Sequence, residues 1–131
     1  MFELLMLMSA LLFGGMVLYS FGFAAFVFSA LPAETAGPLI RRAFPHFYLF
    51  CLGVALAAAA LAFAVDPVSG WILMAIAATT VPARQILMPA INRATDTGNA
   101  GRFKLLHGAS VLLTLMHIVG AAYVIVRLAA L

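Results

Sequence analysis

Residues 4–33 read LLMLMSALLFGGMVLYSFGFAAFVFSALPA, thirty residues in succession without a charged side chain. Three further uncharged stretches follow along the chain, at residues 43–65, 67–83 and 105–126. A helix needs roughly 20 mostly apolar residues to cross the hydrocarbon core of a bilayer. Because each stretch meets or approaches that length, the sequence predicts four membrane-spanning helices.

The composition leaves no room for a soluble domain. Hydrophobic residues make up 66% of the 131-residue chain and charged residues 8%, against roughly 45–50% and 25% in soluble domains. We therefore expect an integral membrane protein with one transmembrane domain over residues 1–131, folded as an all-α four-helix bundle. The expected helices cover about residues 3–31, 44–65, 68–91 and 103–128.

The connections between these helices differ in character. Asp66-Pro67 and the small polar residues after it predict a tight turn between the second and third helices. The first connection, residues 32–45, contains the apolar pair Leu39-Ile40 next to the basic pair Arg41-Arg42. Apolar side chains against the membrane and arginines in water predict a short interfacial helix within this connection.

Lysine and arginine residues concentrate at one end of the expected bundle. The first and third connections contain five of them, at Arg41, Arg42, Arg93, Arg102 and Lys104. The opposite end contains only Arg127. By the positive-inside rule, the basic connections lie in the cytoplasm. Both termini then face outward across the plasma membrane, which is the inner membrane if the source is a bacterium.

Two segments of the chain resemble the transmembrane protein 205-like family of small four-helix membrane proteins. The first runs over residues 14–45 and contains the pattern Leu31-Pro32, Ala36-Gly37 and Phe44-Pro45. The second joins residues 88–92, Met-Pro-Ala-Ile-Asn, to the Leu-His-x-x-Ser pattern of residues 106–110. Together they cover the first helix, its connection, and parts of the third and fourth helices.

The resemblance is to a family of largely unknown function. Its human member is associated with resistance to platinum drugs, which implies a role in transport or export. This chain departs from the family pattern at two places: Ala24-Ala25 stands where members often have a proline, and Thr114 where they often have an asparagine. A polar site built on that asparagine would be altered here.

The fourth expected helix has the clearest polar pattern. His107, Ser110, Thr114, His117 and Ala121 follow one another at spacings of three, four, three and four residues. At 100° per residue they fall within an arc of about 80°, so they form one seam that faces other helices. Titratable imidazoles in such a seam suit a proton or ion path. Interhelical hydrogen bonding that only fixes packing would explain the same pattern.

The third expected helix adds Arg84, Gln85 and Asn92 to the candidate binding residues. Pro82 and Pro89 each remove a helical hydrogen bond and free a carbonyl four residues earlier. Free carbonyls beside Arg84, which lies partly within the membrane, could bind an anion or a polar headgroup. The simpler alternative is that Arg84 extends to the phosphates of the cytoplasmic leaflet.

Other kinds of site find little support in the sequence. Three histidines, seven methionines and the single Cys51 have no metal-ligand spacing, so we expect no metal and no cofactor. No nucleophile–base pair or paired carboxylates appear, and we do not expect an enzyme. The net charge of +3 needs only anionic lipid headgroups as partners, and no nucleic acid.

Three functions are compatible with these observations. The first is transport or export of a small solute or metal species through a polar seam between the third and fourth helices, in a homo-oligomer or larger assembly, because four helices enclose little volume. The second is an accessory subunit that packs against a larger membrane complex. The third is a b-type cytochrome or copper protein.

Overall fold

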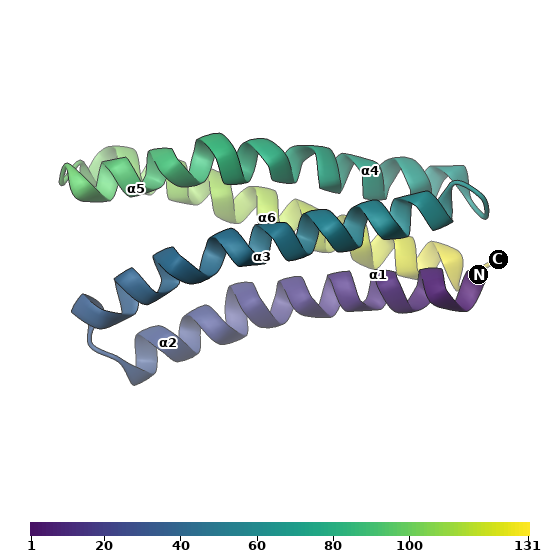
Figure 1. Cartoon of the computed structure of the whole chain (residues 1–131), viewed down its shortest axis with the longest axis horizontal. Helices are drawn as coiled ribbons and strands as arrows, with labels where there is room; N and C mark the ends of the chain where they lie inside the picture. Colours follow the sequence, from purple (N-terminus) through teal and green to yellow (C-terminus); the bar gives the residue numbers. More distant parts are fainter.

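Four long helical rods run up and down in the computed structural model, which describes all residues from Met1 to Leu131 (Figure 1). All four rods are long and apolar enough to cross a membrane, so the predicted four-helix membrane bundle is confirmed. Two rods contain a π-helical segment, labelled η. The elements are α1 (Phe2–Val17), η1 (Leu18–Phe23), α2 (Ala24–Ala30), α3 (Ala33–Ala62), α4 (Pro67–Pro82), η2 (Ala83–Leu87), α5 (Met88–Asp96) and α6 (Ala100–Leu128).

Local chemistry explains where the rods end. Leu31 is extended (φ −123°, ψ 149°), as expected for a residue that precedes proline. Asp66 accepts a hydrogen bond from the backbone N–H of Ser69 and caps the start of α4. At the third connection, Gly98 has a φ of +67°, which glycine adopts without strain, and the Asn99 side chain caps α6.

The segment expected to form a separate interfacial helix is instead the first part of α3. That helix begins at Ala33 rather than near residue 44 and runs through Pro38 and Pro45 without a break. The prediction of a separate helix was wrong because each proline removes one hydrogen bond without ending a helix near its water-exposed end. The third rod also extends further than expected, to Asp96 instead of residue 91.

The rods are longer than a bilayer core is thick. Each contains 29 or 30 residues, which corresponds to about 45 Å at 1.5 Å per residue. The hydrocarbon core is roughly 30 Å thick, so the rods tilt or their ends reach into the headgroup region. Figure 1 shows both termini at one end of the bundle. We call the opposite end, where α2 leads into α3 and α5 into α6, the basic end.

Small side chains bring the second and third rods together. One face of α3 buries Ala55, Ala58, Ala59 and Ala62 within the same core as Leu73 and its neighbours on α4. Small residues allow helix backbones to approach closely in a membrane, where van der Waals packing takes the place of the hydrophobic effect between helices. The alanine run in the sequence is therefore a packing surface.

A glycine pair on α1 offers a test of this packing. A Cβ atom built on Gly15 would lie 2.5 Å from the Phe50 ring of α3, whereas one built on Gly14 would have no neighbour within 4 Å. We expect Gly15→Leu to destabilise the bundle by about 1–3 kcal/mol, the usual cost of overpacking. Thermal unfolding in detergent would measure this, with Gly14→Leu as the matched control. Equal losses for both variants would contradict the assigned contact.

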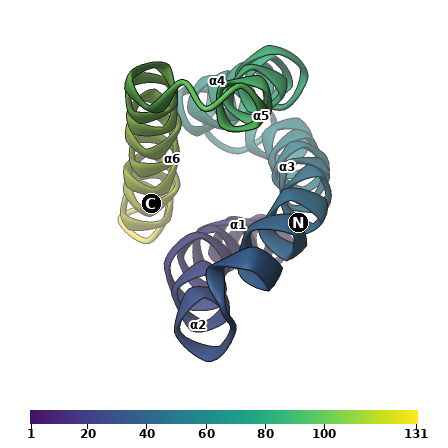
Figure 2. The same cartoon turned by 90° about the vertical axis from the view of Figure 1, so that its left-hand side faces the viewer.

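The two ends of the bundle differ in how closely the rods approach. Viewed from the basic end, α6 stands apart from α2, and its distal half approaches α1 near the termini (Figure 2). Close backbone contacts join α6 to α1, α4 and α5, and α2 to α3. The first and fourth rods therefore diverge toward the basic end.

Candidate functional site

The seam of α6 makes its deepest contact with α4. The His117 side chain is buried, and its Nε2 lies 2.7 Å from Thr79 Oγ1. Thr79 Oγ1 also lies 2.7 Å from the Ala75 carbonyl, to which it donates its proton. With its proton on Nε2, His117 can donate to Thr79 Oγ1 while Thr79 donates to the Ala75 carbonyl. This bond joins α6 to α4, and similar bonds contribute about 0.6 kcal/mol on average in membranes.

Thr114 and Ser110 lie about one and two turns closer to the basic end than His117. Ser110 Oγ is 3.4 Å from the Tyr48 hydroxyl of α3. Thr114 donates its hydroxyl proton to the Ser110 carbonyl of its own helix, at 3.0 Å. Both side chains are half-buried. The seam therefore faces the interior of the bundle, as its spacing predicted, but it contacts two different helices along its length.

The first residue of the seam is free of such contacts. His107 is exposed, and its ring is stacked on Phe103 with the centroids 5.3 Å apart. Asn92, at the end of α5, is half-buried and lines two of the same hollows as His107. The structure thus brings His107 and Asn92 to the same space, although they come from different rods.

This space is a cleft, which we call the α2–α6 cleft. It consists of three adjacent hollows of about 280, 120 and 560 Å³ that share lining residues, among them Ile40 and His107. The 280 Å³ inner chamber lies between the first rod and α6, at Ser20, Phe28, Ser110 and Thr114 among others. The 560 Å³ outer chamber opens at the basic end beside Asn92 and His107.

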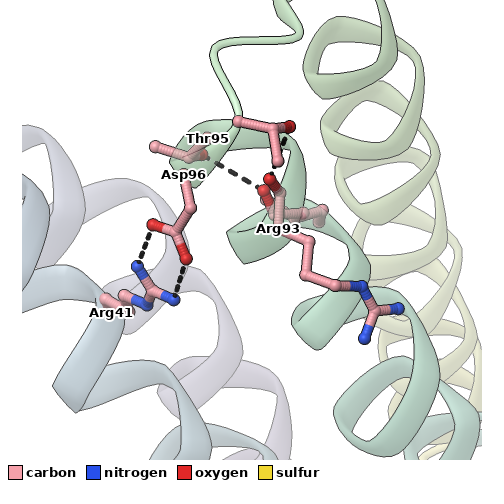
Figure 3. A network of polar contacts seen from close by, with 6 residues as sticks. Arg41, Arg93, Thr95 and Asp96 are labelled. Atoms are coloured by element: carbon pink, nitrogen blue, oxygen red, sulfur yellow. Dashed lines mark hydrogen bonds and ion pairs between the residues drawn. The ribbon is translucent and has the colours of Figure 1, made fainter.

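An ion pair stands at the wall of the outer chamber. The Arg41 guanidinium donates two hydrogen bonds to the Asp96 carboxylate, at 2.7 and 2.9 Å (Figure 3). Both side chains are about half exposed, and the pair joins the start of α3 to the end of α5. Arg93, also on α5, points its guanidinium away from the pair (Figure 3).

Arg84 and Gln85 do not reach the α2–α6 cleft. Arg84 Nε donates to the Pro45 carbonyl of α3 at 3.3 Å, and its Nη1 donates to Gln85 Oε1 at 3.3 Å. Neither side chain borders any of the three hollows of the cleft. Of the three candidate residues expected on the third rod, only Asn92 therefore lines the cleft.

A second ion pair closes the opposite end. The Asp66 carboxylate accepts two hydrogen bonds from Arg127 of α6, at 2.6 and 2.9 Å. It also accepts hydrogen bonds from the Ser69 hydroxyl and backbone N–H. These donors hold the pKa of the Asp66 carboxyl well below its usual range, and the Arg127 guanidinium has the largest effect. We call these three residues the terminal clasp.

The three histidines lie apart from one another. His46 borders a different hollow of about 720 Å³, an apolar groove between the first rod and α3. His107 lines the α2–α6 cleft and His117 contacts Thr79, so no two of them face a common point. No group of three histidine, cysteine or acidic residues lies close enough together to hold a metal ion.

Several residues of the site had no clear signal in the sequence. Tyr48, Arg41 and Asp96 sit on rods other than α6, and their proximity to the cleft depends on how the rods are rotated. The sequence did place Arg41 and Asp96 in the first and third connections between the uncharged stretches. In an up-and-down bundle these two connections lie at the same end, so a pairing between the two residues could have been inferred from the topology.

The geometry can be set beside known proteins. A family model described as a domain of unknown function (DUF4149) matches residues 7–100. The chain belongs to this family. The match runs from α1 through to the start of α6 and includes the first rod, the Arg41–Asp96 pair and Asn92. No curated protein and no solved structure matches this DUF4149 chain. Its class, a small membrane protein of an uncharacterised family, agrees with the expectation from the sequence.

Proposed function

We propose that this DUF4149 protein binds a small solute in the α2–α6 cleft and moves it across or out of the membrane. The supporting observation is that His107, Ser110 and Thr114 border the inner chamber, and that His107 also borders the outer chamber at the basic end. Polar side chains are expensive within a bilayer unless they face a partner or water. The resemblance of the chain to the transmembrane protein 205-like family supports the same role.

The role that we propose is not enzymatic. Ser110, the one hydroxyl of the seam with a side-chain partner, is paired with Tyr48 at 3.4 Å and not with a histidine that could remove its proton. Hydroxyl, amide and imidazole groups along the cleft suit reversible hydrogen bonding to a ligand. We therefore assign these residues to binding.

A complete path needs more than the single chain provides. At the terminal end, α1 lies against α6 and the terminal clasp links α6 to the turn before α4. The cleft is thus closed toward the termini in this conformation. We propose that transport requires either separation of α1 from α6 or a homo-oligomer in which a second copy completes the path.

A thiol-labelling experiment tests whether the cleft is open to water. Cys51 is the only cysteine and is buried, so Cys51→Ala provides a cysteine-free background. In that background we expect Ser110→Cys to react with a membrane-impermeant thiol reagent added at the basic end. The rate should exceed that of Val119→Cys by roughly tenfold or more, because only a hydrated thiol ionises readily.

Val119 is the matched control because it lies on the same helix and is 67% exposed on the surface that faces lipid. Mass spectrometry of the labelled protein would give both rates. Similar rates at the two positions would contradict an aqueous cleft and with it the proposed binding site.

One feature supports an accessory subunit as the second candidate. The helix α6 exposes a row of large apolar side chains outside the cleft, including Leu112, Met116 and Val119. A larger membrane complex could cover this surface. Gentle solubilisation followed by mass spectrometry distinguishes the candidates, since a large partner in fixed stoichiometry supports the accessory role.

A further inference from the structure

We propose that the ligand of the α2–α6 cleft is an amphiphile with a single hydrocarbon chain, which enters sideways from the bilayer. This inference rests on the proposed function and specifies the chemical class of its ligand. The first argument is the position of the opening. The inner chamber has one wall from the first rod and one from α6, and these rods diverge toward the basic end (Figure 2). Because Phe21, Phe28 and Val111 at this chamber are exposed, we infer that the chamber opens to the surrounding lipid.

The side chains at this lateral opening are apolar and uncovered. Phe21 and Phe28 line the inner chamber, yet they are 47% and 54% exposed. Val111 borders the same chamber from α6 and is also exposed. A hydrocarbon chain can therefore enter the chamber from the bilayer along these exposed apolar side chains. A freely soluble polar solute would gain nothing from these walls.

The cleft becomes more polar toward the basic end, which gives an amphiphile a direction. The outer chamber is bordered by Glu34, Asn92 and His107 together with the Arg41–Asp96 pair. Since Arg41 and Asp96 neutralise each other, Glu34 is the one carboxylate there without an ion-pair partner. We therefore infer a headgroup that is uncharged or zwitterionic, and not one that is purely anionic.

The size of the inner chamber limits the number of chains. Its volume of about 280 Å³ lies at the lower end of the roughly 300–1,000 Å³ of ligand pockets. The middle hollow adds only about 120 Å³ between α3, α5 and α6. One flexible chain fits such a space, and a second chain would remain outside in the bilayer.

Photocrosslinking in proteoliposomes tests this inference. The probe is a lysophosphatidylcholine with a photoactivatable group at the end of its single chain. We expect adducts on the residues that border the inner chamber, identified by peptide mass spectrometry. Val111→Trp and Ala25→Trp fill the chamber from opposite walls, and each should lower the adduct yield by about tenfold, because a filled pocket can no longer bury the ligand.

Val119→Trp adds the same bulk to the lipid-facing surface of α6 and should leave the yield unchanged. Melting of each variant, monitored by fluorescence, shows whether it is folded. Val111→Trp and Ala25→Trp lie on different helices, so a folding defect in one leaves the other as a test.

Adducts spread evenly over lipid-facing residues, or a yield unaffected by both filling variants, would overturn the inference. If Ser110→Cys is labelled but no lipid adduct forms in the chamber, the aqueous binding site stands and the amphiphile does not.

Discussion

Replacing Asp66 with alanine should lower the unfolding temperature of the bundle more than any other substitution of a charged residue. Asp66 is only 6% exposed, and its carboxylate receives all its hydrogen bonds from Arg127 and Ser69. The substitution removes the cap of α4 and leaves Arg127 without its counter-ion. The unpaired partner of a broken, poorly hydrated ion pair accounts for most of such a loss.

Two comparisons separate the parts of this effect. Asp66→Asn keeps an oxygen that can cap α4 but loses the ion pair, so its unfolding temperature should lie between those of the wild type and Asp66→Ala. Asp96→Ala breaks the Arg41 pair at the basic end, where both side chains are about half exposed, and should have little effect because exposed pairs contribute little. A larger loss for Asp96→Ala than for Asp66→Ala would contradict this ranking.

The same carboxylate gives the fold an acid-sensitive component. The pKa of Asp66 in the folded state is lowered by Arg127 and Ser69, relative to an ordinary value of about 3.9. A lowered pKa means that the ionised form stabilises the fold above about pH 4, and that this stabilisation is lost as the pH falls toward the lowered pKa. In Asp66→Asn that loss should be absent. The single Trp71, which packs on Phe63 close to the clasp, provides a local fluorescence signal for these measurements.

A reporter fused after Leu131 should be active only outside the cytoplasm. Five lysine and arginine residues lie at the basic end and one at the terminal end, and such a difference orients short membrane proteins almost completely. Alkaline phosphatase at this position should be active and green fluorescent protein dark. The matched control is insertion of each reporter at Gly98, in the turn before α6, where the two signals should exchange. A dark phosphatase and a bright fluorescent protein at Leu131 would reverse the orientation.

Much of the fold could be predicted because it depends on features that are local in the sequence. The uncharged stretches define the rods, and Asp66-Pro67 defines the turn between α3 and α4. The position of the start of α3 was missed because Pro38 and Pro45 resemble helix breaks. Near a helix end, however, water can satisfy the carbonyl that a proline leaves free. Sequence alone does not show whether that water is available.

The site was predicted less completely, because it depends on the relative rotation of the rods. The spacing of His107, Ser110, Thr114 and His117 predicted a seam that faces inward. The structure agrees for Ser110, Thr114 and His117, whereas His107 is exposed. The spacing alone did not show that His117 would contact α4 while Ser110 contacts α3. The π-helical turns matter here, since each adds a residue to a turn and rotates everything beyond it. Arg84 and Gln85 lie within η2, where a regular helical period does not give their direction.

The closed terminal end and the divergent basic end have a consequence for membrane sidedness. In the lateral entry that we propose, the opening between α2 and α6 lies toward the leaflet next to the basic end, because α1 lies against α6 at the other end. The two leaflets of a membrane exchange lipids slowly and differ in composition. On this proposal the protein samples the lipids of a single leaflet, so the position of the opening restricts the choice of ligand before any side chain contacts it.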